Sequence, residues 1–470
     1  MHSYSRGLLV IGLDAADPRW IFNQWRGKLP AFSYIMEKGC YGALESTVPP
    51  TTIPAWLSLV TGRDPGELGV YGRRNRRDYG YADFAATPFD SLRIKTIWDY
   101  LDLYHKRSLV VGVPATFPPR KVNGIVISGN QTPSAEAACT YPPGFKQEIA
   151  HRIEENFFDV PDFRSQGPER LHLLVKQMTR KRLRLVHDIL KRFRFDFTMA
   201  VLLGTDRIHH GYWRYMDKGH PEYTPDSPFG HVIMDYYTWL DKQVGKCIDR
   251  YFADHDIMVV SDHGVRTCLG CFAVNQWLEE KGYLRRKQTG GSAFDSRDID
   301  WSQTRAWATG GFCGRIYFNL QGREPQGIVP ASQRQALQEE LRRELENVTD
   351  LQGQPLGNRC FLPKRVFRKT NGIAPDLLLY AANLAYRCSA DFSEHWFSAP
   401  EELAANDGAS HSQDGIFMLL QKEPRALGDM GKWSIYDITP TIMDHFMMPK
   451  GRLKGRSILS FPESTRVVFR

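Results

Sequence analysis

The sequence predicts an α/β fold in which helices cover both faces of a mostly parallel central sheet. Three observations predict it: short runs of branched apolar residues, helical segments between these runs, and polar residues directly after them. The four clearest strand segments are GLLVIGLD (7–14), RSLVVGVP (107–114), FTMAVLLGTD (197–206) and DIMVVSDHG (256–264). Because such strands are apolar along their whole length, both of their faces should be covered. An α/β/α sandwich satisfies that requirement.

The segments between these strands have the spacing of amphipathic helices. Clear examples are TIWDYLDLYHKR (96–107) and MDYYTWLDKQVGKCIDRYF (234–252). A third segment, RKRLRLVHDILKRFRF (180–195), combines this spacing with many basic residues. Basic amphipathic helices bind nucleic acids or membrane surfaces in some proteins. The apolar positions Leu183, Val186 and Leu190 instead predict that this helix packs on the sheet.

Two segments break the alternation of strand and helix. One contains the proline-rich TPSAEAACTYPPGF, and the other contains RIYFNL and the charged helix SQRQALQEELRRELENV. We interpret both as insertions, after which APDLLLYA (374–381) is predicted to return to the central sheet. The expected organisation is a core in residues 1–130, 181–265 and 373–470, a helical cap in 131–180 and a mixed α/β insertion in 266–372.

The composition of the 470-residue chain, 42% hydrophobic and 24% charged, is that of an ordinary globular protein. The net charge of +8 favours a small anionic substrate, and because Lys and Arg are spread along the chain, no nucleic-acid partner is expected. No apolar stretch approaches the roughly 20 residues of a membrane span, and LLVIGL is too short for the core of a signal peptide. A cytoplasmic location without membrane insertion is therefore expected, and no pattern predicts the oligomeric state.

Eight scattered cysteines are not the pattern of a disulfide framework. Cys268 and Cys271 form one CxxC, which without a second ligand pair we interpret as two buried thiols rather than a zinc site.

Three aspartates follow the predicted strands: Asp14, Asp206 and Asp262. In open α/β sheets, ligands bind at the carboxyl ends of the strands, so these carboxylates should converge. His210 lies four residues after Asp206, on the same face of the following helix, and His263 follows Asp262 directly. Carboxylate and imidazole ligands together suit zinc, and also manganese. The pattern predicts a metal site at this edge.

Other residues near this edge receive different roles. His209 points to another face of the same helix, so we assign it a structural or supporting role. In VPPTTIPAWLSLVTG (48–62), Thr52 lies two residues before Pro54 and at or near the start of a helix. Helix N-termini favour bound anions. Beside metal-binding aspartates, the hydroxyl of Thr52 becomes a candidate nucleophile.

These motifs occur in the order typical of the alkaline phosphatase superfamily. They are Asp14, Thr52-x-Pro54 followed by TGRDP, Asp206-x-x-x-His210, Asp262-His263-Gly264, and His411 in GASHSQDGIF. The sequence resembles the type I phosphodiesterase and nucleotide pyrophosphatase branch in particular. Similarity also appears in NQWLEEKGYL, GRIYFNLQGREPQGIV and YDITPTIMDHF, so the resemblance covers nearly the whole chain.

The resemblance implies an alkaline-phosphatase-like sandwich with cap insertions and a metal-dependent phosphoric ester hydrolase, most simply a phosphodiesterase or nucleotide pyrophosphatase. It implies two zinc ions, or manganese, with Thr52 between them as the nucleophile that forms a phosphothreonine intermediate. The implied ligand sets are Asp206, His210 and His411 for one ion, and Asp14, Asp262 and His263 for the other.

The substrate stays open at this point. Arg73, Arg74 and Asn75 are candidates to contact a phosphate oxygen of a small, nucleotide-like ester. A phosphomonoesterase or phosphonate hydrolase could use the same site. Sulfatases need a Cys or Ser in place of Thr52, and the related mutases usually present Ser. A non-catalytic protein that binds phosphate esters is the alternative of another class.

Overall fold

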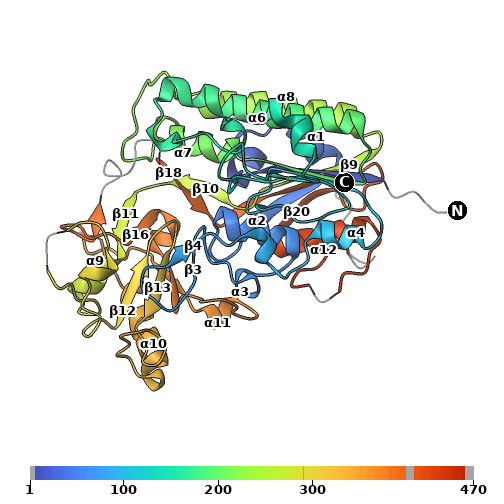
Figure 1. Cartoon of the computed structure of the whole chain (residues 1–470). Helices are drawn as coiled ribbons and strands as arrows, with labels where there is room; N and C mark the ends of the chain where they lie inside the picture. Colours follow the sequence, from blue (N-terminus) through green and yellow to red (C-terminus); the bar gives the residue numbers. More distant parts are fainter. Residues whose placement is uncertain are drawn as a thin grey trace.

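The computed structural model describes residues 6–153, 155–288, 291–350, 352–398, 407–451 and 453–460. Its centre is a nine-stranded sheet (Figure 1). In spatial order the strands are β20 (Gly428–Ser434), β2 (Cys40–Glu45), β19 (Asp414–Leu420), β9 (His255–Val260), β1 (Gly7–Leu13), β8 (Phe197–Leu202), β5 (Ser108–Val111), β6 (Gly124–Ile127) and β7 (Thr140–Tyr141). Only β19 and β7 run antiparallel to their neighbours in this sheet. The predicted mostly parallel sheet is confirmed, with the four clearest predicted strands side by side at its centre.

Helices cover both faces of the sheet, as Figure 1 shows. One face carries α1 (Pro30–Lys38), α6 (Pro168–Arg192), α7 (Gly204–Met216) and α8 (Val232–Tyr251); the other carries α2 (Thr52–Thr61), α4 (Ile97–Asp102) and α12 (Ile438–His445). Side chains alternate between these layers along β1: Leu8 and Val10 pack with α2, whereas Leu9 and Ile11 pack with α8. The α/β/α sandwich is confirmed.

A smaller body, built on a second sheet, packs beside this sandwich (Figure 1). Its antiparallel strands are, in order, β12 (Ala306–Thr309), β13 (Gly314–Phe318), β15 (Leu377–Tyr380) and β14 (Arg359–Phe361), with α9 (Val274–Glu280) and α10 (Arg334–Glu346) beside them. The prediction that 374–381 returns to the central sheet is wrong. Leu377 and Leu379 instead pack against Leu337 and Leu341 of α10. A short apolar strand fits either sheet, so its pattern does not choose between them.

Smaller elements complete the described chain. They are α3 (Pro65–Leu68), α5 (Phe145–Ile149), α11 (Pro363–Val366), the pair β3 (Asn75–Arg76) and β4 (Phe84–Ala85), the pair β10 (Gly264–Thr267) and β18 (Ala409–Ser412), and the sheet β16 (Tyr386–Ser389), β11 (Gly270–Ala273) and β17 (Phe397–Ser398). In the predicted cap, 131–180, lie β7, α5 and the first half of α6. Cys268 and Cys271 are free, buried thiols, as expected. Within the described ranges, none of the helices combines the length and apolar character that a membrane crossing requires.

Helix α6 packs on the sheet as predicted for 180–195. Of the three predicted positions, Val186 is buried, and Leu183 and Leu190 are half-buried against the core; Leu185 and Ile189 are buried as well. It also buries a charged side chain, Arg182, which is 1% exposed. One guanidinium nitrogen of Arg182 donates to the carbonyl of Val201 (2.7 Å), and another donates to the carbonyls of Phe157 (2.7 Å) and Phe158 (3.2 Å). Burial lowers the pKa of Arg182 to about 10.

Arg182→Met is expected to lower the free energy of unfolding by about 3 kcal/mol, because it leaves three buried carbonyls without their donor. Urea unfolding followed by circular dichroism measures this change. Arg170→Met, at an exposed position of the same helix, is the control and should change stability by less than about 0.5 kcal/mol. Equal stability of the two variants would contradict the role of Arg182.

Candidate active site

Three carboxylates meet at the carboxyl edge of the central sheet. Asp14 follows β1, Asp262 follows β9, and Asp206 lies in the first turn of α7, directly after β8. Because β1 pairs with both β8 and β9, the sheet places the three side chains together. Asp14 and Asp262 are fully buried, and Asp206 is 3% exposed. The convergence predicted from the strand ends is therefore present.

Two histidines join these carboxylates through the short β10–β18 pair. The register places His411 opposite Val265, two residues beyond His263, and the two imidazoles stack with centroids 3.7 Å apart. Nδ1 of His411 lies 2.8 Å from the carbonyl of Pro50, and Nδ1 of His263 lies 3.0 Å from that of Gly264. Carbonyls bonded at Nδ1 orient both rings so that each Nε2 faces the carboxylates.

The ligand atoms form two groups that could each hold a cation. One is Asp14, Asp262 and His263, and the other is Asp206, His263 and His411; within each group the atoms lie within 4.8 Å of one another. One oxygen each of Asp14, Asp206 and Asp262 is buried without a hydrogen bond in the described part of the chain. Buried polar atoms normally have partners, so these orphaned oxygens fit coordination of a cation. Mixed oxygen and nitrogen donors fit zinc or manganese.

The first group is the set that the resemblance implies. The second group differs from the implied set: it contains His263 in place of His210. His210 lies beside it, with Nε2 3.2 Å from Oδ1 of Asp206, the same oxygen that Nε2 of His411 approaches at 3.8 Å. All six predicted ligands therefore surround one buried space.

The pKa values show how strongly this space disfavours uncompensated negative charge. Burial and the nearby Asp206 raise the pKa of Asp14 well above its usual value, and burial and Asp14 do the same to Asp262. Burial also acts to raise the pKa of Asp206, but His210 and Arg207 outweigh it and lower this pKa. Bound cations would supply the charge that Asp14 and Asp262 lack.

Two of the three predicted histidine ligands, His263 and His411, are held in the form that binds metals, whereas Asp206 and Asp407 outweigh burial and raise the pKa of His210. Burial lowers the pKa of His263 to about 4, and burial with the neighbouring His263 lowers that of His411. Both imidazoles are then neutral at pH 7, as ligation requires. His209 is different: its ring stacks on Tyr237 and meets Trp213 edge-on, and burial lowers its pKa to about 3. It contacts aromatic rings rather than the carboxylates.

Thr52 lies at the opening of this buried space. It is the first residue of α2, after Thr51 at the N-cap, and Pro54 occupies the same first turn. Its Oγ1 is 3.4 Å from Nε2 of His263. The hydroxyl is half-buried and faces the ligand groups, at a helix end that favours anions.

A pocket of about 350 Å³ opens above the site, lined by Thr52, Asp206, His210 and His411. Arg73 and Arg74 also line it, from the loop after α3. The Arg74 guanidinium donates to the carbonyl of Phe84 (2.9 Å). These two arginines therefore lie at the rim of the pocket, where the predicted contacts with a phosphate oxygen could be made.

Asn75 is not among the residues that line the pocket. Its Oδ1 accepts from the amide of Tyr71 (2.7 Å), and its Nδ2 donates to the carbonyl of Gly72 (3.1 Å) and the hydroxyl of Thr87 (3.1 Å). The side chain thus holds the shape of the loop that presents Arg73 and Arg74.

Several residues of the site were not predicted. Oδ1 of Asp407 lies 3.2 Å from Nδ1 of His210, and Arg387 forms a bidentate ion pair with Asp407. Phe312 stacks on His411 with centroids 3.5 Å apart. Arg207 pairs with Asp206 and, at 2.6 Å, with Asp159. Arg387 and Phe312 come from segments far from the predicted ligands in the sequence, whereas Arg207 directly follows Asp206 and Asp407 lies four residues before His411, two positions that pointed toward the site.

The comparisons with known proteins agree with this geometry. The family model "Type I phosphodiesterase / nucleotide pyrophosphatase" matches residues 8–408. Murine ectonucleotide pyrophosphatase / phosphodiesterase 5 is similar in structure, with a TM-score of 0.55 and 12% identity over 96% of this chain and 97% of that chain. An inactive threonine-to-alanine form of the murine protein, in complex with AMP, matches equally well.

The human protein of the same name has a TM-score of 0.54 and 13% identity over the same shares of the two chains. At these identities the structural matches show the fold alone. No curated protein matches the sequence. The family match spans most of the chain, and the chain therefore belongs to the type I phosphodiesterase / nucleotide pyrophosphatase family of the alkaline phosphatase superfamily and is a hydrolase of phosphoric ester bonds.

Proposed function

We propose that the protein is a phosphodiesterase or nucleotide pyrophosphatase in which Thr52 attacks phosphorus beside two divalent metal ions. One observation carries this proposal: the Thr52 hydroxyl, at a helix N-terminus, lies 3.4 Å from Nε2 of His263, beside three carboxylates that each keep an oxygen without a hydrogen bond in the described structure. A merely structural cluster of buried acids would have those oxygens satisfied by hydrogen bonds.

The residues that would hold the ions are the six predicted ligands: Asp206, His210 and His411 for one, and Asp14, Asp262 and His263 for the other. Zinc suits these donors best, and manganese is the second candidate. When bound, the ions would neutralise charge on the transferring phosphoryl group and favour ionisation of nearby hydroxyl groups.

We propose that the reaction has two steps, both at the Thr52 hydroxyl. As the bond between Thr52 Oγ1 and phosphorus forms, the bond from phosphorus to the leaving group breaks, which gives a phosphothreonine that still carries the second ester group of the substrate. Water then cleaves the Oγ1–phosphorus bond and regenerates Thr52, so the products are a monoester and the leaving alcohol or phosphate. The first turn of α2 favours the anionic phosphate throughout.

The rim of the pocket supports a nucleotide-like substrate. Its cationic side chains include Arg73, Arg164 and Arg315, and Phe163 and Phe312 add flat apolar surface. Guanidinium groups suit phosphate, and aromatic rings suit a base. The complex of the murine relative with AMP agrees with this choice. We assign Arg73 and Arg74 to phosphate contact, with Asn75 shaping their loop.

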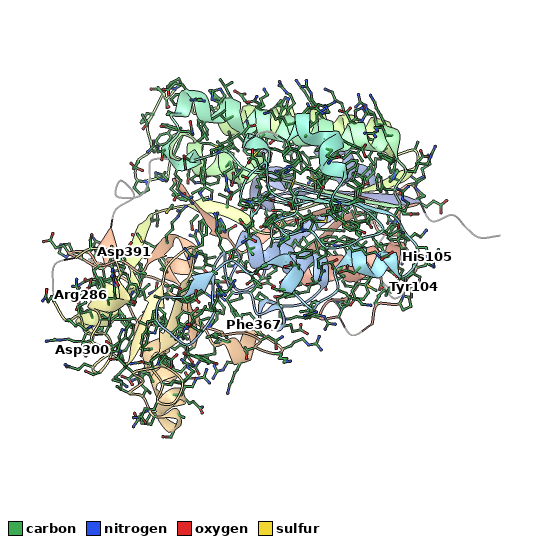
Figure 2. All side chains as sticks on the ribbon, in the orientation of Figure 1. Tyr104, His105, Arg286, Asp300, Phe367 and Asp391 are labelled. Atoms are coloured by element: carbon green, nitrogen blue, oxygen red, sulfur yellow. The ribbon has the colours of Figure 1, made fainter. Side chains whose placement is uncertain are left out.

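Asp407→Asn is expected to weaken zinc affinity about tenfold or more, because the carboxylate that orients His210 loses its charge. Competition with a chromophoric chelator measures the affinity. Asp391→Asn is the control, since Asp391 lies on the smaller body (Figure 2) and accepts from the amide of Phe294 and the hydroxyl of Ser389. Unchanged zinc affinity in Asp407→Asn would show that Asp407 does not position His210 for metal binding.

Chelation is expected to abolish hydrolysis of an aryl phosphodiester, and zinc or manganese should restore it. Elemental analysis of the purified protein should find about two metal ions per chain. Comparing aryl monoester and diester rates tests the substrate class, and faster monoester turnover would favour a phosphomonoesterase. Stoichiometric binding of a phosphate ester by the metal-loaded protein, without turnover of either ester, would instead favour a non-catalytic binding protein.

A further inference from the structure

A second cavity, of about 310 Å³, lies between α6 and α8 on the central sheet. The two helices run side by side over one face of the sheet in Figure 1. None of the residues that line it line the active-site pocket. Its floor is formed within β1 and β8, whereas the active site lies beyond the ends of these strands. It is therefore a separate cavity.

The floor of this cavity is apolar and accessible. Leu9 and Ile11 of β1 and Ala200 of β8 line it, and each keeps 3% of its surface exposed. Leu8 and Val10, on the opposite face of β1, are fully buried. Solvent thus reaches the sheet between α6 and α8 but not on the other side. An apolar group in the cavity would cover this exposed surface.

The wall of the cavity is strongly cationic. Arg180 and Arg184 come from α6, and Lys246 and Arg250 come from α8. The lining residues among those described include no Asp or Glu, and within that part of the chain no carboxylate pairs with any of these four cations. Cations normally have counter-charges when they are brought together, so this wall favours an anion.

The remaining wall residues agree with this charge pattern. The guanidinium carbon of Arg180 lies 5.9 Å from the centroid of the Trp239 ring. Nη1 of Arg250 forms a hydrogen bond with Nε2 of His187 (2.9 Å). Burial, Arg250 and Lys191 lower the pKa of His187. The ring is held as a neutral partner rather than as a further charge.

We propose that this cavity binds a small amphipathic anion, with its apolar body on Leu9, Ile11 and Ala200 and its acidic group among the cations of α6 and α8. A carboxylate, sulfonate or phosphate group on a short alkyl or aryl body has this chemistry. The cavity volume lies at the small end of the range for ligand pockets, which favours one such molecule over a large cofactor.

Calorimetric titration with octanesulfonate, below the concentration at which it forms micelles, tests the proposal. One molecule should bind per chain. The double variant Arg184→Gln/Lys246→Gln should weaken binding about tenfold or more, because two charge-assisted contacts are lost. Arg170→Gln, an exposed position of the same helix outside the cavity, should bind as the parent does. Inorganic sulfate, which has no apolar body, should bind at least about tenfold more weakly.

Cysteine alkylation locates the bound molecule. Cys247 lines the cavity, and Cys360 is the other partly exposed cysteine in the described ranges. Octanesulfonate should slow modification of Cys247 by N-ethylmaleimide, read by mass spectrometry, and leave the rate at Cys360 unchanged. Equal binding by the parent and the double variant, or no protection of Cys247, would overturn the proposal. Binding to anionic vesicles but not to monomeric octanesulfonate would also overturn it, in favour of a membrane surface.

Discussion

Thr52→Ala is expected to lower the turnover of an aryl phosphodiester by at least about a thousandfold, because no other group would form the bond to phosphorus. Thr52 lies at the start of α2 with its hydroxyl 3.4 Å from Nε2 of His263. The substitution removes a hydroxyl and a methyl group from a half-buried position, so folding should be preserved. Initial rates at saturating substrate measure the loss.

Two further measurements separate a lost nucleophile from a damaged site. The Thr52→Ala protein should keep about two metal ions per chain, since no predicted ligand is changed. Thr52→Ser, which restores a hydroxyl, should recover part of the activity, and mass spectrometry of quenched parent enzyme should find the phosphoryl group with its retained ester group on the peptide that contains Thr52. Full activity in Thr52→Ala would overturn the assignment of the nucleophile.

Asp262→Asn is expected to lower the metal content from about two ions per chain to about one and to reduce turnover at least about a thousandfold. Oδ1 of Asp262 accepts from the amide of Ala15 (3.2 Å), a bond that asparagine can keep. Oδ2 has no hydrogen bond in the described structure and lies 3.2 Å from Nε2 of His263. The variant therefore removes the charge that a cation would meet while preserving the fold.

Stability distinguishes a metal ligand from an ordinary buried acid. Burial and the neighbouring Asp14 raise the pKa of Asp262, so its ionised form destabilises the metal-free protein near pH 7. In excess chelator, Asp262→Asn should thus unfold at the same temperature as the parent or higher. Asp241→Asn is the matched control, because this buried carboxylate accepts from the amides of Ala31 (3.2 Å) and Phe32 (2.9 Å). It should keep both metals and full turnover. Normal metal content in Asp262→Asn would contradict the site.

The parts of the fold that were predictable depend on local patterns. The strands ending at Asp14, Asp206 and Asp262 are apolar runs, and the rule that parallel strands share their carboxyl edge brings the three aspartates together. The strand at Leu377 has the same pattern but belongs to the other sheet. Its partners lie on β13 and β14, and sequence periodicity carries no information about such pairings.

The supporting residues of the site were harder to predict for a related reason. Asp407 matters because it meets both His210 and Arg387 in space, across large separations along the chain. The position of Asp407 four residues before His411 is a local signal, but nothing local marks Arg387, on β16, as its partner. The fold class predicts that metal ligands lie at the strand ends. Which residues orient those ligands can be seen only in the packed structure.

The position of β19 has a consequence for the order in which the protein is made. This strand, residues 414–420, lies between β2 and β9 and pairs with both. While a ribosome is still extending the chain, β2 has no way to join the strands around β1, and the short β10–β18 pair that carries His411 is also missing. The pairings of β2 and β9 with β19 thus wait until residues 414–420 have been translated. An emerging chain is unable to assemble its full metal site before these segments are made, so hydrolysis should begin only after His411 and β19 have left the ribosome.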